Sequence, residues 1–349
     1  MKIAFIDPAR AYDANAPWQG PLGGTQSAAC YLAIELARRG HRITLYNHIA
    51  TPTAAQGVEA RNWAELFEGA ASVHDALVLV GRWTGDMVTE LKKLNPRVIG
   101  WMHEAAFHSE FIVPHPALSA MVFVSHWQQR VNSAALGDIH TQVIENAVSP
   151  FAEQLAPGQM PKNPHRAVFA GDTLRGLLPL VALWPQIHGI DPALTLEIYS
   201  DRMLNGATPA QAEAFEAQLA ALPGLAHIGK VSQQQLANAM AGASYHLSPN
   251  PYPETSCITL MEALALGCHS VTTARAALPE TAHGFAELVP VGDADSQRND
   301  VPLDGAAFVE AFRRIYAQPF DASAQRAHFL AQHTWARQAE RWEAFLDRL

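Results

Sequence analysis

The sequence has few cysteines, few charged residues and no long apolar run. Among its 349 residues it has only three cysteines, and 16% of the residues are charged. The cysteines, Cys30, Cys257 and Cys268, are too few for a disulfide framework, so we expect reduced thiols. No segment approaches the roughly 18 consecutive apolar residues that a membrane-spanning helix needs.

An excess of positive charge is also absent. The chain has 24 Lys and Arg against 33 Asp and Glu, which gives a formal net charge of −9. This balance argues against a nucleic-acid-binding surface and against a polybasic membrane anchor. The apolar stretch in MKIAFIDPAR is shorter than the core of a signal peptide. We therefore expect a cytoplasmic protein with at most peripheral contact at the inner face of the membrane.

Short apolar runs alternate with helical patterns in the first part of the chain. The run KIAFI (2–6) predicts a buried strand, and the spacing over 25–39 predicts a helix that stops at Gly40. Further strands are expected at 42–46, 76–80, 97–102, 121–125 and 141–144. This alternation predicts a parallel sheet with helices on both faces.

The pattern restarts after 146–164, a stretch rich in Pro, Ala and Gln that predicts a linker. Strands are then expected at 166–171, 194–200, 225–229, 244–248, 269–273 and 287–291. The chain length fits two domains of about 150–200 residues each. We predict an α/β protein with two Rossmann-like doubly wound domains, 1–150 and 151–320, that face each other across a ligand-binding cleft. A C-terminal helix in 321–349 is expected to pack toward the first domain.

Two carboxylates stand close to the start of a helix predicted at 255–266. Glu254 precedes this helix, and Glu262 follows about two turns later, which places them roughly 12 Å apart along its axis. This spacing is comparable with the length of a sugar–diphosphate–ribose group. Backbone N–H groups between them, near Ser256 and Cys257, would point at anions. A dipole-favoured Glu followed by an incidental second Glu is the structural alternative.

The segment PETSCITLMEALALGC (253–268) resembles the Glu-x7-Glu signature of retaining glycosyltransferases of the GT-B fold, family 4 in the usual classification. Weaker similarities to that family extend over nearly the whole chain. They are PLGGTQSAA (21–29), WMHE (101–104), VFVSHWQQ (122–129), VIENAV (143–148), FAGDTLRGLLPLVALWPQI (169–187), LPET (278–281) and TWARQAERW (334–342).

The resemblance implies metal-independent transfer of a sugar from a nucleotide-sugar to an acceptor hydroxyl with retention of anomeric configuration. It assigns the UDP- or GDP-sugar donor to the second domain and a saccharide or lipid-linked acceptor to the first. Glu254 would be catalytic, Glu262 would bind ribose, and the residues at the helix start, Thr255, Ser256 and Cys257, would complete the donor site. No cofactor is expected, and the pathway would be polysaccharide or cell-envelope glycan biosynthesis.

Arg175 is the candidate for a diphosphate clamp, because it follows strand 166–171 and precedes a helix expected at Gly176. Where many members of the family carry a further Arg, this chain has Asp172, so a second cation would have to come from elsewhere, and Lys230 is the candidate. A surface role for Arg175 is the structural alternative.

Two further candidates lie in the first domain. Gly23 and Gly24 open the first long helix, where a backbone without Cβ atoms allows close approach of a ligand. They do not form the spaced glycine fingerprint of a dinucleotide site. His103 ends strand 97–102, and the resemblance would place it beside the donor sugar as a third catalytic residue. An ordinary helix-entry turn and a structural histidine are the respective alternatives.

Two other classes of function fit the same two-domain frame. One is a sugar-nucleotide epimerase or a phosphorylase, although no lysine has a compelling context for a bound cofactor. The other is a non-catalytic nucleotide-sugar-binding protein. Release of nucleoside diphosphate from the correct donor would distinguish a transferase from both.

Overall fold

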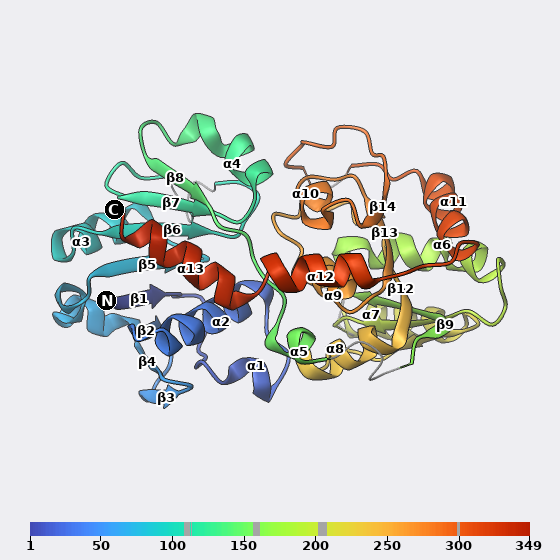
Figure 1. Cartoon of the computed structure of the whole chain (residues 1–349), viewed down its shortest axis with the longest axis horizontal. Coiled ribbons are helices and arrows are strands. Elements are labelled where there is room, and N and C mark those ends of the chain that lie inside the picture. Colours follow the sequence, from blue (N-terminus) through green and yellow to red (C-terminus); the bar gives the residue numbers. More distant parts are fainter. Residues whose placement is uncertain (108–111, 113, 156–160, 202–207, 299–300) are drawn as a thin grey trace. The chain divides into compact units, whose positions relative to one another are not determined.

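A computed structural model describes residues 1–107, 112, 114–155, 161–201, 208–298 and 301–349. The chain divides into two compact units (Figure 1). Unit 1 contains Met1–Ala147 together with His333–Leu349, and unit 2 contains Val148–Gln332. The last helix of the chain therefore belongs to the same unit as the first strand.

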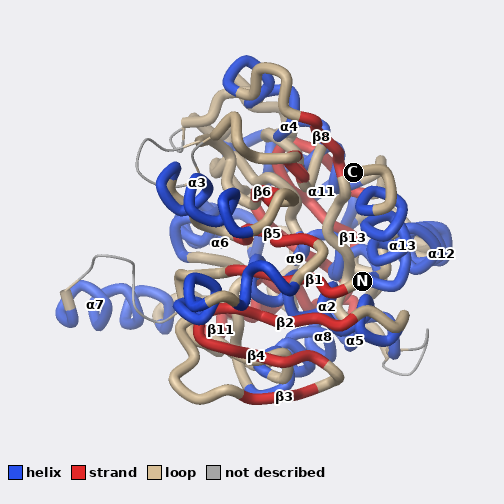
Figure 2. The backbone as a smooth tube through the Cα atoms, turned by 90° about the vertical axis from the view of Figure 1, so that its left-hand side faces the viewer, coloured by secondary structure: helices blue, strands red, loops and turns tan. Residues whose placement is uncertain are grey.

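Unit 1 is built on one eight-stranded sheet with the order β3-β4-β2-β1-β5-β6-β7-β8. All neighbouring strands are parallel except β3 and β4, which are antiparallel. Figure 2 shows β2, β4 and β3 in succession at one edge of the sheet. The chain proceeds from β1 to one side of the sheet and then crosses to β5 on the other side. The strands are β1 (Lys2–Ile6), β2 (Arg42–Asn47), β3 (Thr53–Ala55), β4 (Val58–Asn62), β5 (Ala76–Val80), β6 (Val98–Met102), β7 (Ala120–Phe123) and β8 (His140–Val143).

Apolar packing holds the C-terminal helix to unit 1. Trp342 on this helix makes edge-on ring contacts with Phe5 of β1 and Trp101 of β6, with centroids 6.3 and 5.2 Å apart. An ion pair of 2.6 Å joins Arg39 to Glu343. The described helices of this unit are α1 (Ala16–Gln19), α2 (Gly24–Arg38), α3 (Gly85–Leu94), α4 (His126–Asn132) and α13 (Trp335–Leu346), with short 3-10 turns at Trp63–Glu68, Ala70–Val73 and Ser133–Ala135.

Unit 2 is built on a six-stranded, fully parallel sheet with the order β11-β10-β9-β12-β13-β14. The chain runs outward from β9 through β10 to β11, and then returns to β12 on the other side of β9. The strands are β9 (Asn163–Ala170), β10 (Thr195–Tyr199), β11 (Leu225–His227), β12 (Ala243–Ser248), β13 (His269–Thr273) and β14 (Ala286–Val289).

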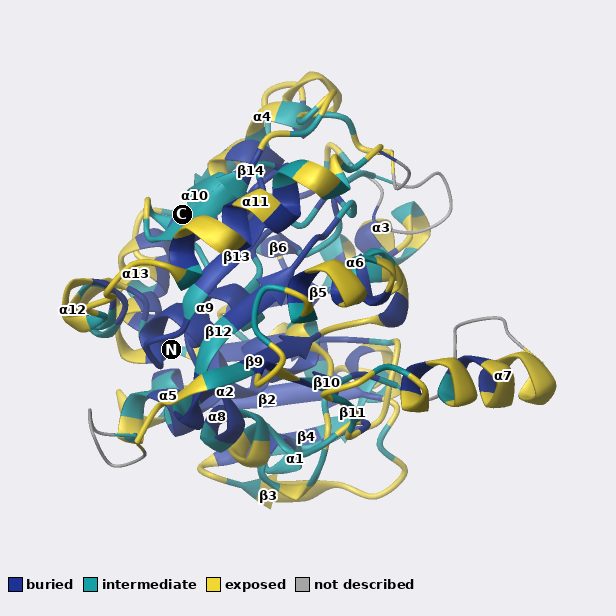
Figure 3. Cartoon of the chain, turned by 90° about the vertical axis from the view of Figure 1, so that its right-hand side faces the viewer, coloured by how far each residue is buried: buried dark blue, intermediate teal, exposed yellow. Residues whose placement is uncertain are grey.

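Helices cover both faces of this sheet. An apolar cluster of this unit includes Phe169 of β9, Leu247 of β12 and Phe312 of α11. Figure 3 shows the resulting stripe, since α11 is buried on one side and exposed on the other. The described helices are α5 (Pro150–Gln154), α6 (Leu178–His188), α7 (Pro209–Ala220), α8 (Gln233–Gly242), α9 (Ile258–Ala265), α10 (Leu278–Ala282), α11 (Gly305–Tyr316) and α12 (Ser323–Gln332).

The predicted fold class, an α/β chain with two Rossmann-like parallel sheets, is confirmed, and two local expectations are corrected. The helix predicted at 255–266 begins at Ile258, because Cys257 has an extended ψ of 93° and acts as its N-cap. The expected linker contains α5 and the start of β9. Strands β3 and β4 were not predicted, because their short polar segments lack an apolar pattern. None of the helices described combines the length and apolar composition needed to cross a bilayer.

Candidate functional site

The candidate site lies in unit 2, where the chain changes direction across the sheet. Strands β9 and β12 are neighbours, but their following connections lead to opposite sides of the sheet. In open parallel sheets, ligands bind at the carboxyl ends of the two strands that flank such a switch point. The loop after β9 contains Arg175, and the loop after β12 contains Glu254.

Gly176 allows these two loops to meet. Its φ is +114°, a left-handed conformation that favours glycine, and a Cβ at this position would lie 3.2 Å from the carbonyl oxygen of Pro249. The atoms Cα and N of Asn250 would each lie 3.3 Å from the same Cβ. Because of this turn, helix α6 begins at Leu178, after Gly176. The turn leaves Arg175 in the loop that faces β12.

Arg175 and Glu254 form the centre of the site. Nη1 of Arg175 lies 3.3 Å from Oε1 of Glu254. The guanidinium carbon lies 4.1 Å from the ring centroid of Tyr252, a cation–π distance. The side-chain amide of Asn250 donates a hydrogen bond of 3.1 Å to the same Glu254 oxygen. The prediction from the sequence placed Arg175 and Glu254 in this site, and the structure brings them into direct contact.

Asn250 and Tyr252 are site residues that the sequence reasoning missed. Both stand in the segment NPYPE, between β12 and Glu254. Their position directly after a buried strand of a parallel sheet could have identified them from the sequence. The side chain of Glu254 is 13% exposed and that of Arg175 is 40% exposed, so the pair lies at the surface of the unit and not in its interior. A guanidinium and a carboxylate in this setting can bind an anionic group and a hydroxyl side by side.

Glu262 lies on α9 and is buried, with 7% of its surface exposed. One of its oxygens accepts a 3.0 Å hydrogen bond from the backbone N–H of Ser149, the N-cap residue of α5. Burial raises the pKa of Glu262, and the hydrogen bonds from Ser149 act in the opposite direction. The contact gives Glu262 a partner inside the unit, and its predicted contact with ribose stays a prediction.

The three residues before α9 form a loop and not the first helical turn. Thr255 and Ser256 are each 8% exposed, and Cys257 is the N-cap residue. The first N–H groups of the helix therefore belong to residues from Ile258 onward. Burial raises the pKa of the Cys257 thiol to about 12. This thiol stays protonated at neutral pH, so it is not an activated nucleophile.

Lys230 follows β11, and its Nζ lies 2.5 Å from a carboxylate oxygen of Asp201. The two side chains are 57% and 45% exposed, so the pair is accessible to water. Asp172 caps the turn after β9 by accepting a hydrogen bond from the N–H of Leu174. That Lys230 provides a second cation for the phosphates stays a prediction.

In unit 1, Gly23 is the N-cap of α2 and Gly24 its first residue. A buried carboxylate, Asp7, lies at the carboxyl end of β1 and accepts hydrogen bonds from Gln26 at 2.8 Å and from Tyr12 at 3.1 Å. Burial, and then the charge of Asp7, raises the pKa of Tyr12 well above its usual range. Asp7 was not predicted from the sequence, although its place directly after the first strand was a signal.

His103 directly follows β6, as predicted, and its ring packs against Trp101 with centroids 4.6 Å apart. Burial lowers the pKa of His103 to about 3. The imidazole is therefore neutral at physiological pH and can both donate and accept hydrogen bonds.

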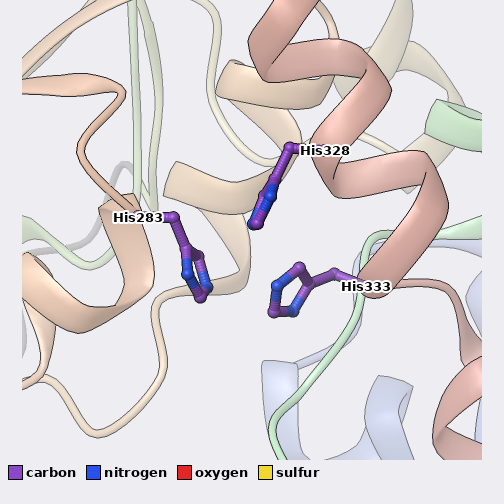
Figure 4. A group of neighbouring side chains, drawn as sticks. All are labelled: His283, His328 and His333. Carbon is purple, nitrogen blue, oxygen red and sulfur yellow. The ribbon is translucent and has the colours of Figure 1, made fainter.

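Two histidines of unit 2 lie close together outside this site (Figure 4). The rings of His283, which follows α10, and His328 on α12 have centroids 4.7 Å apart. His333, also drawn in Figure 4, belongs to unit 1. Two imidazoles are fewer than the three protein ligands that hold a catalytic zinc. This pair is therefore not assigned to the candidate site.

Comparison with the sequences of known proteins gives no match. No model of a protein family matches the chain. No curated protein matches it either.

Solved structures match the whole chain. AviGT4, a glycosyltransferase involved in avilamycin A biosynthesis, has a TM-score of 0.70 at 19% identity, covering 100% of this chain and 97% of its own. Sucrose-phosphate synthase from Thermosynechococcus elongatus has a TM-score of 0.71 at 15% identity, covering 99% and 98%. This chain has the GT-B fold. Anabaena HepE, solved with UDP and glucose, matches this GT-B chain with a TM-score of 0.67 at 14% identity, covering all of both chains.

Proposed function

We propose that the chain is a glycosyltransferase that moves a sugar from a nucleotide-sugar to an acceptor hydroxyl. The observation that carries this proposal is the contact between Arg175 and Glu254 at the switch point of the sheet in unit 2. The similarity to glycosyltransferases of known structure, one of them solved with UDP and glucose, supports it.

Arg175 would bind the diphosphate of the donor. Its guanidinium carbon lies over the Tyr252 ring at 4.1 Å, and the guanidinium has five N–H donors in one plane. A planar guanidinium can contact Glu254 along one edge and a phosphate along another. As the bond between the sugar and the diphosphate breaks, this cation would stabilise the negative charge on the leaving group.

Glu254 would accept hydrogen bonds from sugar hydroxyls. Asn250 orients its carboxylate through the 3.1 Å hydrogen bond, which reduces the number of conformations available to it. The sugar would carry positive character in the transition state, and a fixed carboxylate beside it is favourable. His103, neutral at physiological pH, would contribute a hydrogen bond to the sugar and not a charge.

We further propose retention of anomeric configuration, hexosyl transfer and independence of metal ions. Retention requires the acceptor hydroxyl to attack from the face that the diphosphate leaves. Charge neutralisation by Arg175 would take the place of a divalent cation. The acceptor would be a saccharide or a lipid-linked sugar, used in cell-envelope or other glycan synthesis in the cytoplasm, and the resemblance in sequence assigns its binding to the first unit.

Turnover of a panel of UDP- and GDP-sugars tests this function, with nucleoside diphosphate measured with and without saccharide acceptors. Arg175→Ala and Glu254→Gln should each lower kcat/KM at least a hundredfold, because each removes a group that contacts the transition state. Arg313→Ala is the matched control, since Arg313 forms an exposed ion pair with Glu310 on α11. Near-normal turnover by Glu254→Gln would contradict the assignment.

The same assay tests independence of metal ions. Activity should be unchanged in excess EDTA, because no step of the proposed reaction needs a divalent cation. Loss of turnover in EDTA that manganese restores would contradict this part of the proposal. The anomeric configuration of the product, read by NMR, tests retention.

A further inference from the structure

The sheet of unit 1 has a switch point of its own. Strands β1 and β5 are neighbours, but the chain leaves β1 for β2 on the other side of it. Asp7 directly follows β1, and Gly81 directly follows β5. A Cβ at Gly81, whose φ is +77°, would lie 3.7 Å from Oδ1 of Asp7. Asp7 therefore lies at the edge where open, mainly parallel sheets bind their ligands.

The carboxylate of Asp7 is buried and is held by neutral donors. Oδ1 accepts a 3.0 Å hydrogen bond from the backbone N–H of Ala9. Oδ2 accepts one from the Tyr12 hydroxyl at 3.1 Å and one from the side-chain amide of Gln26 at 2.8 Å. Burial of a carboxylate is costly without such donors. Because Asp7 is only 2% exposed, it acts on its neighbours and not directly on a ligand.

Gln26 connects Asp7 with the turn that opens α2. A carboxylate only accepts, so Gln26 directs its amide N–H groups toward Asp7. Its amide oxygen lies beside Gly23, since a Cβ at that position would come within 2.9 Å of this oxygen. Gly23 and Gly24 are exposed, whereas Gln26 is buried. A displacement of the Gln26 side chain is therefore passed on to the exposed turn.

The same carboxylate holds the loop between β1 and α2 through Tyr12. The Tyr12 hydroxyl donates to Asp7, and the backbone carbonyl of Tyr12 accepts a 2.6 Å hydrogen bond from the side-chain amide of Asn47. Asn47 is the last residue of β2, the strand next to β1. The loop is thus fastened to the ends of two neighbouring strands. A buried network in which every member has its partner restricts those partners to one geometry.

We propose that Asp7 is a positioning residue for the acceptor, because through Gln26 and Tyr12 it holds the exposed turn at Gly23 and Gly24 in one geometry beside the switch point. The inference rests on the proposed function, which assigns the acceptor to unit 1. A misplacement of about 1 Å can lower the rate of a reaction between two bound groups roughly a hundredfold. Loss of Asp7 should therefore impair sugar transfer more than hydrolysis of the donor, which needs no bound acceptor.

The rate of transfer relative to donor hydrolysis tests the proposal. Release of nucleoside diphosphate is measured with the saccharide that gives the highest turnover in the panel, and with water alone. Asp7→Asn keeps the size of the side chain but sets an amide N–H2 against one of the three donors. It should raise the KM for the acceptor and lower transfer at least tenfold, with hydrolysis and the KM for the donor within about twofold of the wild type.

Gln26→Met should reproduce this pattern, because it removes the amide but keeps the length of the side chain. If Asp7 acts through Gln26, the double variant should transfer sugar about as fast as Asp7→Asn alone. Asp75→Asn is the matched control and should behave as the wild type. Asp75 precedes β5 and accepts a 2.7 Å hydrogen bond from the N–H of Lys2, so it lies at the opposite end of the same two strands.

Three results would overturn the inference while leaving the proposed function intact. They are wild-type transfer by Asp7→Asn, an equal loss of transfer and hydrolysis, and full addition of the two effects in the double variant. Should Asp7→Asn fail to fold, the ratio of transfer to hydrolysis in Gln26→Met decides the question. Absence of sugar transfer by the wild-type protein with every donor and acceptor would overturn both.

Discussion

At the scale of single residues, the candidate site depends on short contacts around Glu254. Asn250 and Tyr252 come from the same loop as Glu254, and each contacts one member of the ion pair. Neither residue is charged, so neither stands out in a search for catalytic groups. Their role is positioning, because they act through Arg175 and Glu254.

Tyr252→Leu should weaken donor binding with little change in kcat. A cation–π contact at an exposed site contributes about 0.5–1 kcal/mol, so the KM for the donor should rise roughly two- to fivefold. Tyr252→Phe keeps the aromatic face and should retain the wild-type KM. Steady-state kinetics with saturating acceptor measure both constants. Equal effects of the Leu and Phe variants would show that the ring face is not what holds Arg175.

At the scale of elements, α9 connects the loop of Glu254 with the start of α5. Glu262 on α9 contacts Ser149, a residue 113 positions earlier in the chain. The carboxylate therefore has a structural partner in addition to its proposed ligand. A variant that removes the whole carboxylate loses both the hydrogen bond from Ser149 and the proposed contact with ribose. Comparison of Glu262→Ala with Glu262→Gln separates the structural role from the binding role.

Glu262→Ala should destabilise unit 2, because the buried N–H of Ser149 loses its acceptor at a cost of about 1–3 kcal/mol. Glu262→Gln retains a carbonyl oxygen for this N–H and should leave the free energy of unfolding close to that of the wild type. If Glu262 also binds ribose, both variants should raise the KM for the donor. Urea denaturation followed by donor kinetics measures the two effects. A normal donor KM in Glu262→Gln would argue against the ribose contact.

At the scale of the whole molecule, each unit contains a buried neutral histidine. Burial lowers the pKa of His103 in unit 1 to about 3 and that of His246 on β12 in unit 2 to about 4. Within the part of the chain that the structure describes, neither ring nitrogen of His246 has a hydrogen-bond partner. Unfolding exposes both rings to water, where their pKa returns to about 6.5.

Acidification should therefore destabilise both units. The folded-state pKa values are lower than the unfolded ones, so the stabilising contribution is complete above about pH 6.5 and is lost as the pH falls toward 4 and 3. The slope is about 1.4 kcal/mol per pH unit for each histidine. His246→Gln should reduce the slope for unit 2, because it removes the buried imidazole. Urea unfolding at pH 7, 5.5 and 4.5 checks this, and an unaltered slope in His246→Gln would contradict it.

The sequence by itself determined the order of the apolar strands in both sheets, but not the short polar strands β3 and β4. Runs such as ALVLV at β5 are buried throughout, and this local pattern needs no knowledge of the rest of the fold. Arg175 and Glu254 could be found because both follow buried strands, and the carboxyl ends of parallel strands share one edge of a sheet.

Only the tertiary structure decided which of these groups touch. The turn at Gly176 depends on the close approach of Pro249, and the hydrogen bond of Glu262 joins residues far apart in sequence. Likewise, Ser200, which directly follows β10, lies 3.0 Å from His227 at the end of β11, although the two are 27 positions apart in the sequence. Local patterns fix the elements because they reflect burial of neighbouring residues, whereas contacts between distant loops depend on the packing of the whole unit.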